Sequence, residues 1–302
     1  LGKIGGFGGL FKPDFAGMRE PVLVSSVDGV GTKLKIAFAM NRHDTVAQDL
    51  VNHCVDDIAV LGARPLFFLD YIGAAKLEPS VFDQLIKGFS KACKEAGCAL
   101  IGGETAQMPG MYNPGEYDLA GTIVGVVDRK KMIDGSKIKP GDAILGLPSN
   151  GLHTNGYSLA RKVLFETMKL KPSTKLPGPA KTVGEELLRV HRNYQPLLAS
   201  LPDGLAKGLA HITGGGLVDN LPRVLPKNCD AIIDTASWKV PEIFRLIQHG
   251  GGVDPSEMYQ VFNMGIGMTI IVSEKDVRET IQRTRAKRIG RIETGSGLVQ
   301  LA

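Results

Sequence analysis

Short apolar runs alternate along the chain with longer amphipathic stretches, and the two patterns predict strands and helices respectively. In the first half, the pattern predicts strands at 22–27, 66–72, 99–102 and 119–127, and helices at 33–39, 45–61 and 80–96. Pro79 stands where the last of these helices should begin, a position that favours proline. The alternation indicates an α/β (α+β) chain with mixed sheets and packed helices.

The same alternation resumes after a polar, turn-rich segment, DRKKMIDGSKIKPGD, at 128–142. Strands are expected at 143–147, 231–233, 268–272, 288–292 and 298–301, and helices at 157–168, 183–198 and 217–221. A chain of 302 residues also exceeds the usual size of a single core. We therefore predict a two-domain subunit, with one domain at 1–134 and the other at 135–302.

Composition narrows the class of protein. The net charge is +5, without a concentrated basic stripe, which argues against a nucleic-acid partner and suits anionic small molecules such as phosphates. The four cysteines form no C-x-x-C pair and are typical of reduced cytosolic thiols. The sequence contains no apolar stretch long enough to span a membrane. These features predict a cytoplasmic protein with no membrane segment.

Two predicted strands are followed by reactive polar residues that a simple turn would not require. Asp28-Gly29-Val30-Gly31-Thr32-Lys33 and Gly102-Gly103-Glu104-Thr105 both combine glycines with an acid and a hydroxyl after an apolar run. Glycine amides can approach phosphate oxygens and a carboxylate can hold a cation, so each motif is a candidate phosphate or metal site. Ordinary strand-to-loop turns are the alternative. Neither motif matches the P-loop pattern.

The helix expected at 45–61 has one strongly polar face. At about 100° per residue, that face collects three acids and two neutral side chains, namely Asp49, Asn52, His53, Asp56 and Asp57. No lysine or arginine on this face offsets the repulsion between the acids. A magnesium site and a solvated helix face are both compatible with the pattern.

Two polar loops in the second half are candidate binding segments. PSNGLHTNGYS at 148–158 lies between a strand and a helix, although read alone it is more typical of an Asx-rich turn. HITGGG at 211–216 leads into a short helix and is a candidate anion site, with a flexible linker as the alternative.

Six motifs, taken in order, resemble the aminoimidazole ribonucleotide synthetase (phosphoribosylformylglycinamidine cyclo-ligase) family over nearly the whole chain. They are DGVGTK (28–33), DLVNHCVDDIAVLGARPLFFLDY (49–71), GGETAQMPGMY (102–112), GLHTNGYS (151–158), HITGGGLVDNLPRVLP (211–226) and FNMGIGM (262–268). The resemblance implies ATP bound between two domains, and a homodimer whose N-terminal halves form a shared sheet or barrel. It also implies that ATP phosphorylates the formyl oxygen of formylglycinamidine ribonucleotide, after which a nitrogen attacks and closes the imidazole.

The resemblance assigns roles to individual residues. Mg²⁺ ligands would be Asp28, Asp57 and Glu104, with Asp49 and Asp56 as further candidates. The catalytic set would be Lys33, Asp57 and His153, with Lys33 neutralising phosphate. ATP would contact Gly5, Gly6, Gly8, Lys33, Gly102, Gly103, Glu104 and Thr105. The substrate would contact His153, Asn155, Thr213, Gly214, Gly215 and Gly216.

Some positions depart from the family's usual pattern. The family commonly has Asn at Asp56, Glu at Gln107 and Cys at Met264, and it extends upstream of this chain's first residue. The alternative functions are another ATP-dependent enzyme of the superfamily, resembling thiamine-monophosphate kinase or selenophosphate synthetase, and a non-catalytic nucleotide-binding or maturation scaffold.

Overall fold

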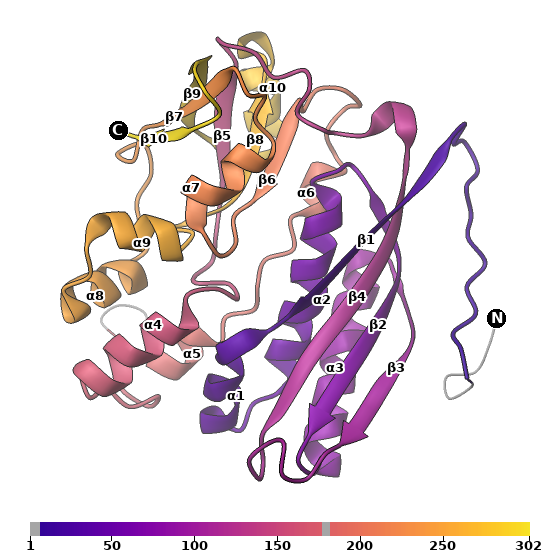
Figure 1. The fold of residues 1–302 in the computed structure, drawn as a ribbon, viewed down its shortest axis with the longest axis vertical. Helices are drawn as coiled ribbons and strands as arrows, with labels where there is room; N and C mark the ends of the chain where they lie inside the picture. Colours follow the sequence, from indigo (N-terminus) through magenta and orange to yellow (C-terminus); the bar gives the residue numbers. More distant parts are fainter. Residues whose placement is uncertain (1–6, 177–181) are drawn as a thin grey trace. The chain divides into compact units, whose positions relative to one another are not determined.

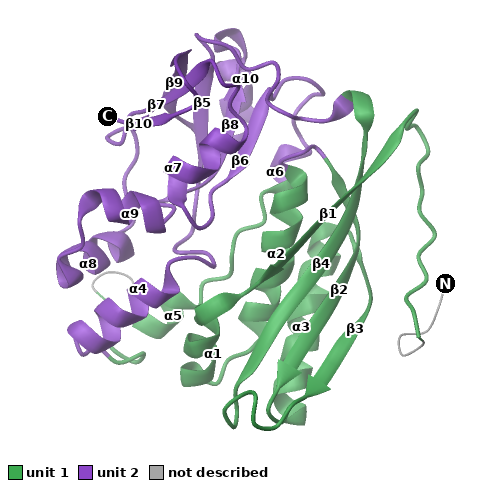
Figure 2. Ribbon diagram, viewed as in Figure 1, with its two compact units in different colours: residues 1–59, 63–130, 171–195 green, residues 60–62, 131–170, 196–302 purple. Residues whose placement is uncertain are grey.

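The computed structural model describes residues 7–176 and 182–302, which form two compact units (Figure 2). Unit 1 combines 1–59, 63–130 and 171–195, and unit 2 combines 60–62, 131–170 and 196–302. Segment 171–195 thus packs with residues far upstream of it. The functional domains 1–134 and 135–302 stay a prediction. Within the described residues, no helix is long and apolar enough to cross a membrane.

Unit 1 is built on a four-stranded sheet in the order β1-β4-β2-β3. Its strands are β1 (Pro21–Gly29), β2 (Arg64–Ala74), β3 (Ala99–Gln107) and β4 (Tyr117–Asp128). β4 runs antiparallel to both of its neighbours, and β3 runs parallel to β2. The register aligns Asp28 with Gly121, Gly121 with Asp70, and Asp70 with Gly103 across the four strands.

Unit 1 contains two short helices that contact each other, α1 (Leu34–Met40) and α5 (Val183–Leu187), and a 3₁₀ turn, η1 (Gly31–Lys33), before α1. One face of the sheet is covered by two longer helices, α2 (Asp44–Ala59) and α3 (Pro79–Ala96) (Figure 1). Side chains at every second sheet position, such as Phe68, Ile72 and Ile123, are fully buried beneath them. This burial follows from the two-residue period of a strand.

The opposite face of the same sheet is apolar and partly uncovered. Leu23 and Val27 on the edge strand β1 are 61% and 68% exposed. The N-terminal segment crosses another part of the face, where the rings of Phe11 and Phe67 lie 5.1 Å apart. Residues of that segment, β2, β3 and β1 line an apolar cavity of about 320 Å³.

Unit 2 contains a six-stranded sheet in the order β10-β7-β9-β5-β8-β6. The strands are β5 (Ala143–Pro148), β6 (Gly208–His211), β7 (Cys229–Ile233), β8 (Ile266–Val272), β9 (Lys287–Thr294) and β10 (Val299–Leu301). The helices are α4 (Tyr157–Arg161), α6 (Gln195–Leu198), α7 (Gly216–Asn220), α8 (Glu242–Gly251), α9 (Pro255–Val261) and α10 (Val277–Thr284). β5 and β6 are each antiparallel to β8, so their carboxyl ends meet the start of β8 at one edge.

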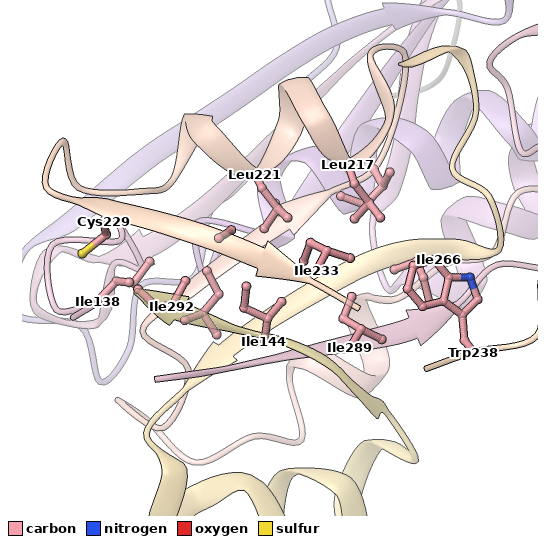
Figure 3. Close-up of a cluster of buried hydrophobic side chains, with 14 residues drawn as sticks. Ile138, Ile144, Leu217, Leu221, Cys229, Ile233, Trp238, Ile266, Ile289 and Ile292 are labelled. Carbon is pink, nitrogen blue, oxygen red and sulfur yellow. The ribbon is translucent and has the colours of Figure 1, made fainter. Parts of the chain in front are cut away.

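The shorter turns are also defined. α4 continues directly into a π-helical stretch, η3 (Lys162–Thr167), and the remaining 3₁₀ turns are η2 (Arg129–Lys131), η4 (Leu221–Arg223) and η5 (Glu274–Asp276). An isoleucine-rich cluster forms the core of unit 2, with Ile144, Ile233 and Ile289 fully buried (Figure 3). Leu217 and Leu221, in the segment that follows β6, pack within this core.

The predicted α/β (α+β) class is confirmed, and most predicted elements are found within a few residues of their expected positions. Two expectations were wrong. The strand expected at 99–102 continues to Gln107, because its backbone pairs with β2 along that whole length. The helix expected at 183–198 is interrupted between Leu187 and Gln195, and β6 was not predicted at all.

Candidate functional site

Two of the predicted metal ligands meet on one histidine in unit 1. His53 Nε2 lies 2.7 Å from Asp28 Oδ2 and 3.8 Å from Asp57 Oδ2. Asp28 lies near the end of β1, whereas His53 and Asp57 lie one helical turn apart on α2, which packs against β1. Ser26 Oγ donates a hydrogen bond to Asp57 Oδ2 at 3.0 Å, and Gly29 N donates to Asp28 Oδ1 at 2.7 Å.

The electrostatics of this cluster favour charged groups. Burial opposes a charged His53 ring, but the hydrogen bond to Asp28 and the charge of Asp57 outweigh it and raise the pKa of His53. Burial likewise works to raise the pKa of Asp28, and the contact with His53 outweighs it and lowers that pKa. The contact with His53 thus favours the ionised form of Asp28, and a carboxylate is the kind of ligand that a divalent cation prefers.

The polar face of α2 is buried beneath the extended segment between α5 and α6. Lys33 and Asp49 form an ion pair of 2.7 Å in which both side chains are fully buried. Lys33 Nζ also donates to the carbonyl of Arg189 at 2.7 Å, and the backbone amide of His191 donates to Asp49 Oδ1 at 2.6 Å. Burial lowers the pKa of Lys33 and raises that of Asp49, and their mutual attraction opposes both shifts.

Asn52 and Asp56 hold the next part of the same segment. Asn52 Nδ2 donates to the carbonyl of His191 at 2.7 Å, and the amide of Tyr194 donates to Asp56 Oδ1 at 2.8 Å. Burial raises the pKa of Asp56 well above its usual range. The polar face of α2 is thus neither a solvated surface nor one metal site, because most of its side chains bind backbone groups of 189–194.

Glu104, the third predicted metal ligand, lies apart from Asp28 and Asp57 within this chain. It is exposed on β3, at the opposite edge of the sheet from β1. Across the sheet, Glu104 is aligned with Tyr71 on β2, which is aligned with Ala120 on β4. Ala120 is in turn aligned with Gly29 on β1. Three strand spacings of about 4.8 Å put it roughly 14 Å from β1. Gly102, Gly103 and Thr105 lie on the same strand.

Gly103 is required by a close approach of β2. A Cβ at this position would lie 2.4 Å from both the carbonyl oxygen and Oδ1 of Asp70. Asp70 is 9% exposed, and burial raises its pKa to about 6. Sequence reasoning did not single out Asp70, because a lone acid within an apolar run carries no motif.

Of the three predicted N-terminal glycines, only Gly8 lies within the described residues, since Gly5 and Gly6 fall outside them. Gly8 is exposed. The adjacent Gly9 lies against β3, where a Cβ would come within 2.9 Å of the Ile101 side chain. The structure therefore brings Gly9 beside the residue that precedes Gly102.

In unit 2, the predicted substrate residues gather where β5 and β6 end and β8 begins. Asn155 Oδ1 would lie 3.2 Å from a Cβ on Gly214, so the two candidate loops are neighbours. The glycine loop is held from inside by Asn220, whose Nδ2 donates to the carbonyls of Gly214 at 3.1 Å and Gly216 at 2.8 Å. Thr213 Oγ1 donates to Asn220 Oδ1 at 3.3 Å.

Asn263 connects a third loop to the first of these loops through hydrogen bonds. Its Oδ1 accepts hydrogen bonds from Ser149 Oγ at 2.9 Å and from the amide of Gly265 at 2.8 Å. Its Nδ2 donates to the carbonyl of Gly151 at 3.0 Å. Asn220 and Asn263 were missed as individual residues, although both stand within quoted motifs.

His153 adopts an unusual backbone conformation in the first loop. Its φ is +62°, and its side chain is 1% exposed. Left-handed backbone in a non-glycine residue is uncommon and occurs often in functional segments, where surrounding contacts maintain it. Gly215 and Gly216 in the neighbouring loop also have positive φ, at +94° and +60°.

Comparison with known proteins identifies the family. Residues 14–127 match the family described as AIR synthase related protein, N-terminal domain, and residues 139–300 match the corresponding C-terminal domain. Among solved structures, thiamine-monophosphate kinase from Stenotrophomonas maltophilia K279a has a TM-score of 0.69 at 19% identity, covering 94% of this chain and 86% of its own. Hydrogenase maturation protein HypE in complex with ATP has a TM-score of 0.70 at 20% identity, covering 96% and 83%. These two likenesses concern the fold alone.

Curated relatives are much more similar in sequence. A phosphoribosylformylglycinamidine cyclo-ligase of Citrifermentans bemidjiense is 56% identical over 284 residues, covering 94% of this chain and 82% of the relative. The enzyme of the same name from Syntrophus aciditrophicus is 52% identical over 300 residues, covering 97% and 86%. The predicted family is therefore confirmed, and the chain belongs to the phosphoribosylformylglycinamidine cyclo-ligase family.

Proposed function

We propose that the chain is an ATP-dependent ligase that converts formylglycinamidine ribonucleotide into 5-aminoimidazole ribonucleotide, with release of ADP and phosphate, in purine biosynthesis. ATP phosphorylates the formyl oxygen, and the ring-forming nitrogen then attacks the activated carbon and expels phosphate. The amide oxygen is a poor leaving group until it is phosphorylated. The observation that carries the proposal is the 56% identity to a cyclo-ligase along 94% of the chain.

Unit 1 supplies the proposed cation site. Asp28 and Asp57 offer carboxylates of the kind that Mg²⁺ prefers, and both lie close to His53. When bound there, Mg²⁺ would neutralise phosphate charge during transfer. Glu104 and the neighbouring Gly102 and Gly103, on β3, are proposed to contact ATP together with Gly8, whose neighbour Gly9 lies against Ile101 of the same strand.

The role of Lys33 as a phosphate contact remains a prediction. In the described geometry its ammonium binds Asp49 and the carbonyl of Arg189. A direct phosphate contact would require it to leave these partners. Its buried pair also fixes segment 189–194 beside the α2 face.

Unit 2 supplies the proposed substrate site. The loops that contain His153, Asn155 and Thr213, together with the glycines at 214–216, offer neutral hydrogen-bonding groups and backbone amides at one edge of the sheet. Such groups suit the amidine, ribose hydroxyls and 5′-phosphate of a ribonucleotide. The internal hydrogen bonds of Asn220 and Asn263 would preorganise these loops.

We also propose a homodimer formed through the uncovered face of the unit 1 sheet. The exposed apolar side chains of Leu23 and Val27 on an edge strand support this arrangement, because such surface is costly to leave in water. A cytoplasmic location stays a prediction.

The test is a reaction with purified protein, ATP, Mg²⁺ and formylglycinamidine ribonucleotide. We expect ADP, phosphate and aminoimidazole ribonucleotide in equal amounts, with little ATP turnover when the ribonucleotide is omitted. A parallel reaction with thiamine monophosphate addresses the kinase-like alternative. Turnover of that substrate, or ATP hydrolysis independent of the ribonucleotide, would overturn the proposal.

A further inference from the structure

Two cysteines meet at the carboxyl end of α3. The helix ends in Gly97, which has a φ of +69° and whose amide donates to the carbonyl of Lys94 at 3.2 Å. The amide of Cys98 donates to the carbonyl of Cys93 at 2.9 Å. These two bonds define a Schellman motif, which brings together the side chains at the first and last of its positions. Cys93 and Cys98 hold those positions.

The motif places the two side chains next to each other. The interaction between the two thiols lowers the pKa of Cys98 and raises that of Cys93. Cys93 is 2% exposed, whereas Cys98 is partly exposed. Cys98 is therefore the sulfur that an external reagent can reach, and Cys93 is the sulfur that lies behind it.

The other cysteines are in different settings. Cys54 is buried, and its thiol donates to the carbonyl of Gly121 at 3.6 Å. Cys229 is also buried, with its sulfur 3.9 Å from Asn228 Oδ1. Burial raises the pKa of both thiols. They provide matched internal controls for any chemistry at α3.

We propose that Cys93 and Cys98 are a redox-active dithiol that exchanges with low-molecular-weight disulfides of the glutathione class. The Cys98 thiolate attacks one sulfur of the reagent, whose S–S bond breaks to release one thiolate. Cys93 then transfers its proton to that thiolate and attacks the Cys98 sulfur of the mixed disulfide, expelling the second thiolate, which takes up a proton from water. The protein dithiol loses two electrons and two protons, and the reagent is reduced to two thiols.

The bond would join the last turn of α3 to the residue before β3. β3 begins at Ala99 and carries the segment 102–105, so oxidation would stiffen the connection on which that strand is anchored. The bridge spans few residues and closes within an existing hydrogen-bonded motif. It therefore requires little rearrangement of the backbone.

The test uses the full chain, reduced, freed of reductant and then incubated with excess oxidised glutathione. Intact mass spectrometry should show the loss of two hydrogen atoms without a retained glutathione, and peptide mapping should find Cys93 joined to Cys98. Dithiothreitol should reverse the change. Hydrogen exchange at the amides that follow Cys98 should slow in the oxidised form.

Variants separate the two roles. Cys93→Ser should stop at a stable glutathione adduct on Cys98, whereas Cys98→Ser should react at least about tenfold more slowly, because the remaining thiol is buried. Cys229→Ser should behave as the unmodified chain. An unchanged mass, a persistent adduct in the unmodified chain, or a bridge that involves Cys54 or Cys229 would overturn the proposal.

Discussion

The ammonium of Lys33 and the carboxylate of Asp49 form a fully buried ion pair, 2.7 Å long, between the 3₁₀ turn after β1 and helix α2. The pair also binds two backbone groups of the segment after α5, the carbonyl of Arg189 and the amide of His191. Besides each other, these two fully buried side chains thus bind two backbone groups. Removal of either charge leaves the other buried and uncompensated.

Lys33→Met should therefore destabilise the protein by about 3–5 kcal/mol, which is the usual cost of breaking one side of a buried pair. The double variant Lys33→Met/Asp49→Asn should recover part of this loss, because Asn keeps an acceptor for the His191 amide without a charge. Urea unfolding gives the free energy of unfolding of the parent chain, the single variant and the double variant. Lys35→Met is the matched control, since Lys35 pairs with Glu116 on a partly exposed surface and should cost less than about 1 kcal/mol. Equal losses for Lys33 and Lys35 would contradict this account.

Asp70 should make stability depend on pH. Its folded pKa of about 6 lies above the ordinary value of 3.8, so the folded state binds more protons than the unfolded state between these values. Stability should consequently fall as pH rises from about 4 to 6, by up to about 3 kcal/mol. Asp70→Asn mimics the protonated form and should remove this loss, so the variant should be more stable than the parent at pH 7 and similar to it below pH 4. A stability difference that stays constant across the range would refute this reading.

Gly103→Ala should disturb β3. The added methyl would meet the backbone oxygen of Asp70 as well as its carboxylate, and a backbone atom cannot move aside as a flexible side chain can. We expect a loss of about 1–3 kcal/mol, typical of an overpacked site. Gly8→Ala is the control, because nothing lies within 4 Å of a Cβ there. Its unfolding free energy should change by less than about 0.5 kcal/mol.

Sequence patterns located most strands and helices because the period of buried positions is a local property. They missed the features that depend on contacts with segments distant in the sequence. The helix expected at 183–198 fails in its middle because Asp49, Asn52 and Asp56 bind backbone groups that a helix would use internally. No local pattern in 188–194 records those partners. β3 was expected to end early because its glycines are typical of a turn, yet Gly103 is there to admit Asp70.

The candidate site was likewise predictable from the sequence only in part. The grouping of Asp28 with Asp57 was predicted through the family resemblance, and both residues lie near His53 in the structure. His53 was recognised only as one member of a polar face, and its contact with both acids depends on how α2 packs on β1. Glu104 was grouped with those acids by the family resemblance and by the similar acid, glycine and threonine residues of its motif. Strand order, which the sequence did not reveal, puts it at the other edge of the sheet.

Asp57→Asn should weaken the proposed cation site. Loss of one carboxylate charge should raise the Mg²⁺ concentration needed for half-maximal turnover by at least about tenfold, equivalent to about 1.4 kcal/mol. Isothermal titration of Mg²⁺ in the presence of a non-hydrolysable ATP analogue gives a second measurement. Asp83→Asn, which changes an exposed acid on α3, should leave both values unchanged. Full Mg²⁺-dependent activity in Asp57→Asn would exclude this residue as a ligand.

Val27→Asp should test the proposed homodimer. Val27 is 68% exposed on the apolar face of β1, and a carboxylate buried in a subunit interface would cost several kcal/mol unless it were paired. Sedimentation velocity should show dimers for the parent chain and mainly monomers for the variant, whose circular dichroism should be unchanged. Leu298→Asp is the matched control, because Leu298 is 59% exposed but belongs to unit 2. If Leu298→Asp dissociates the protein and Val27→Asp does not, the subunits associate through a different surface.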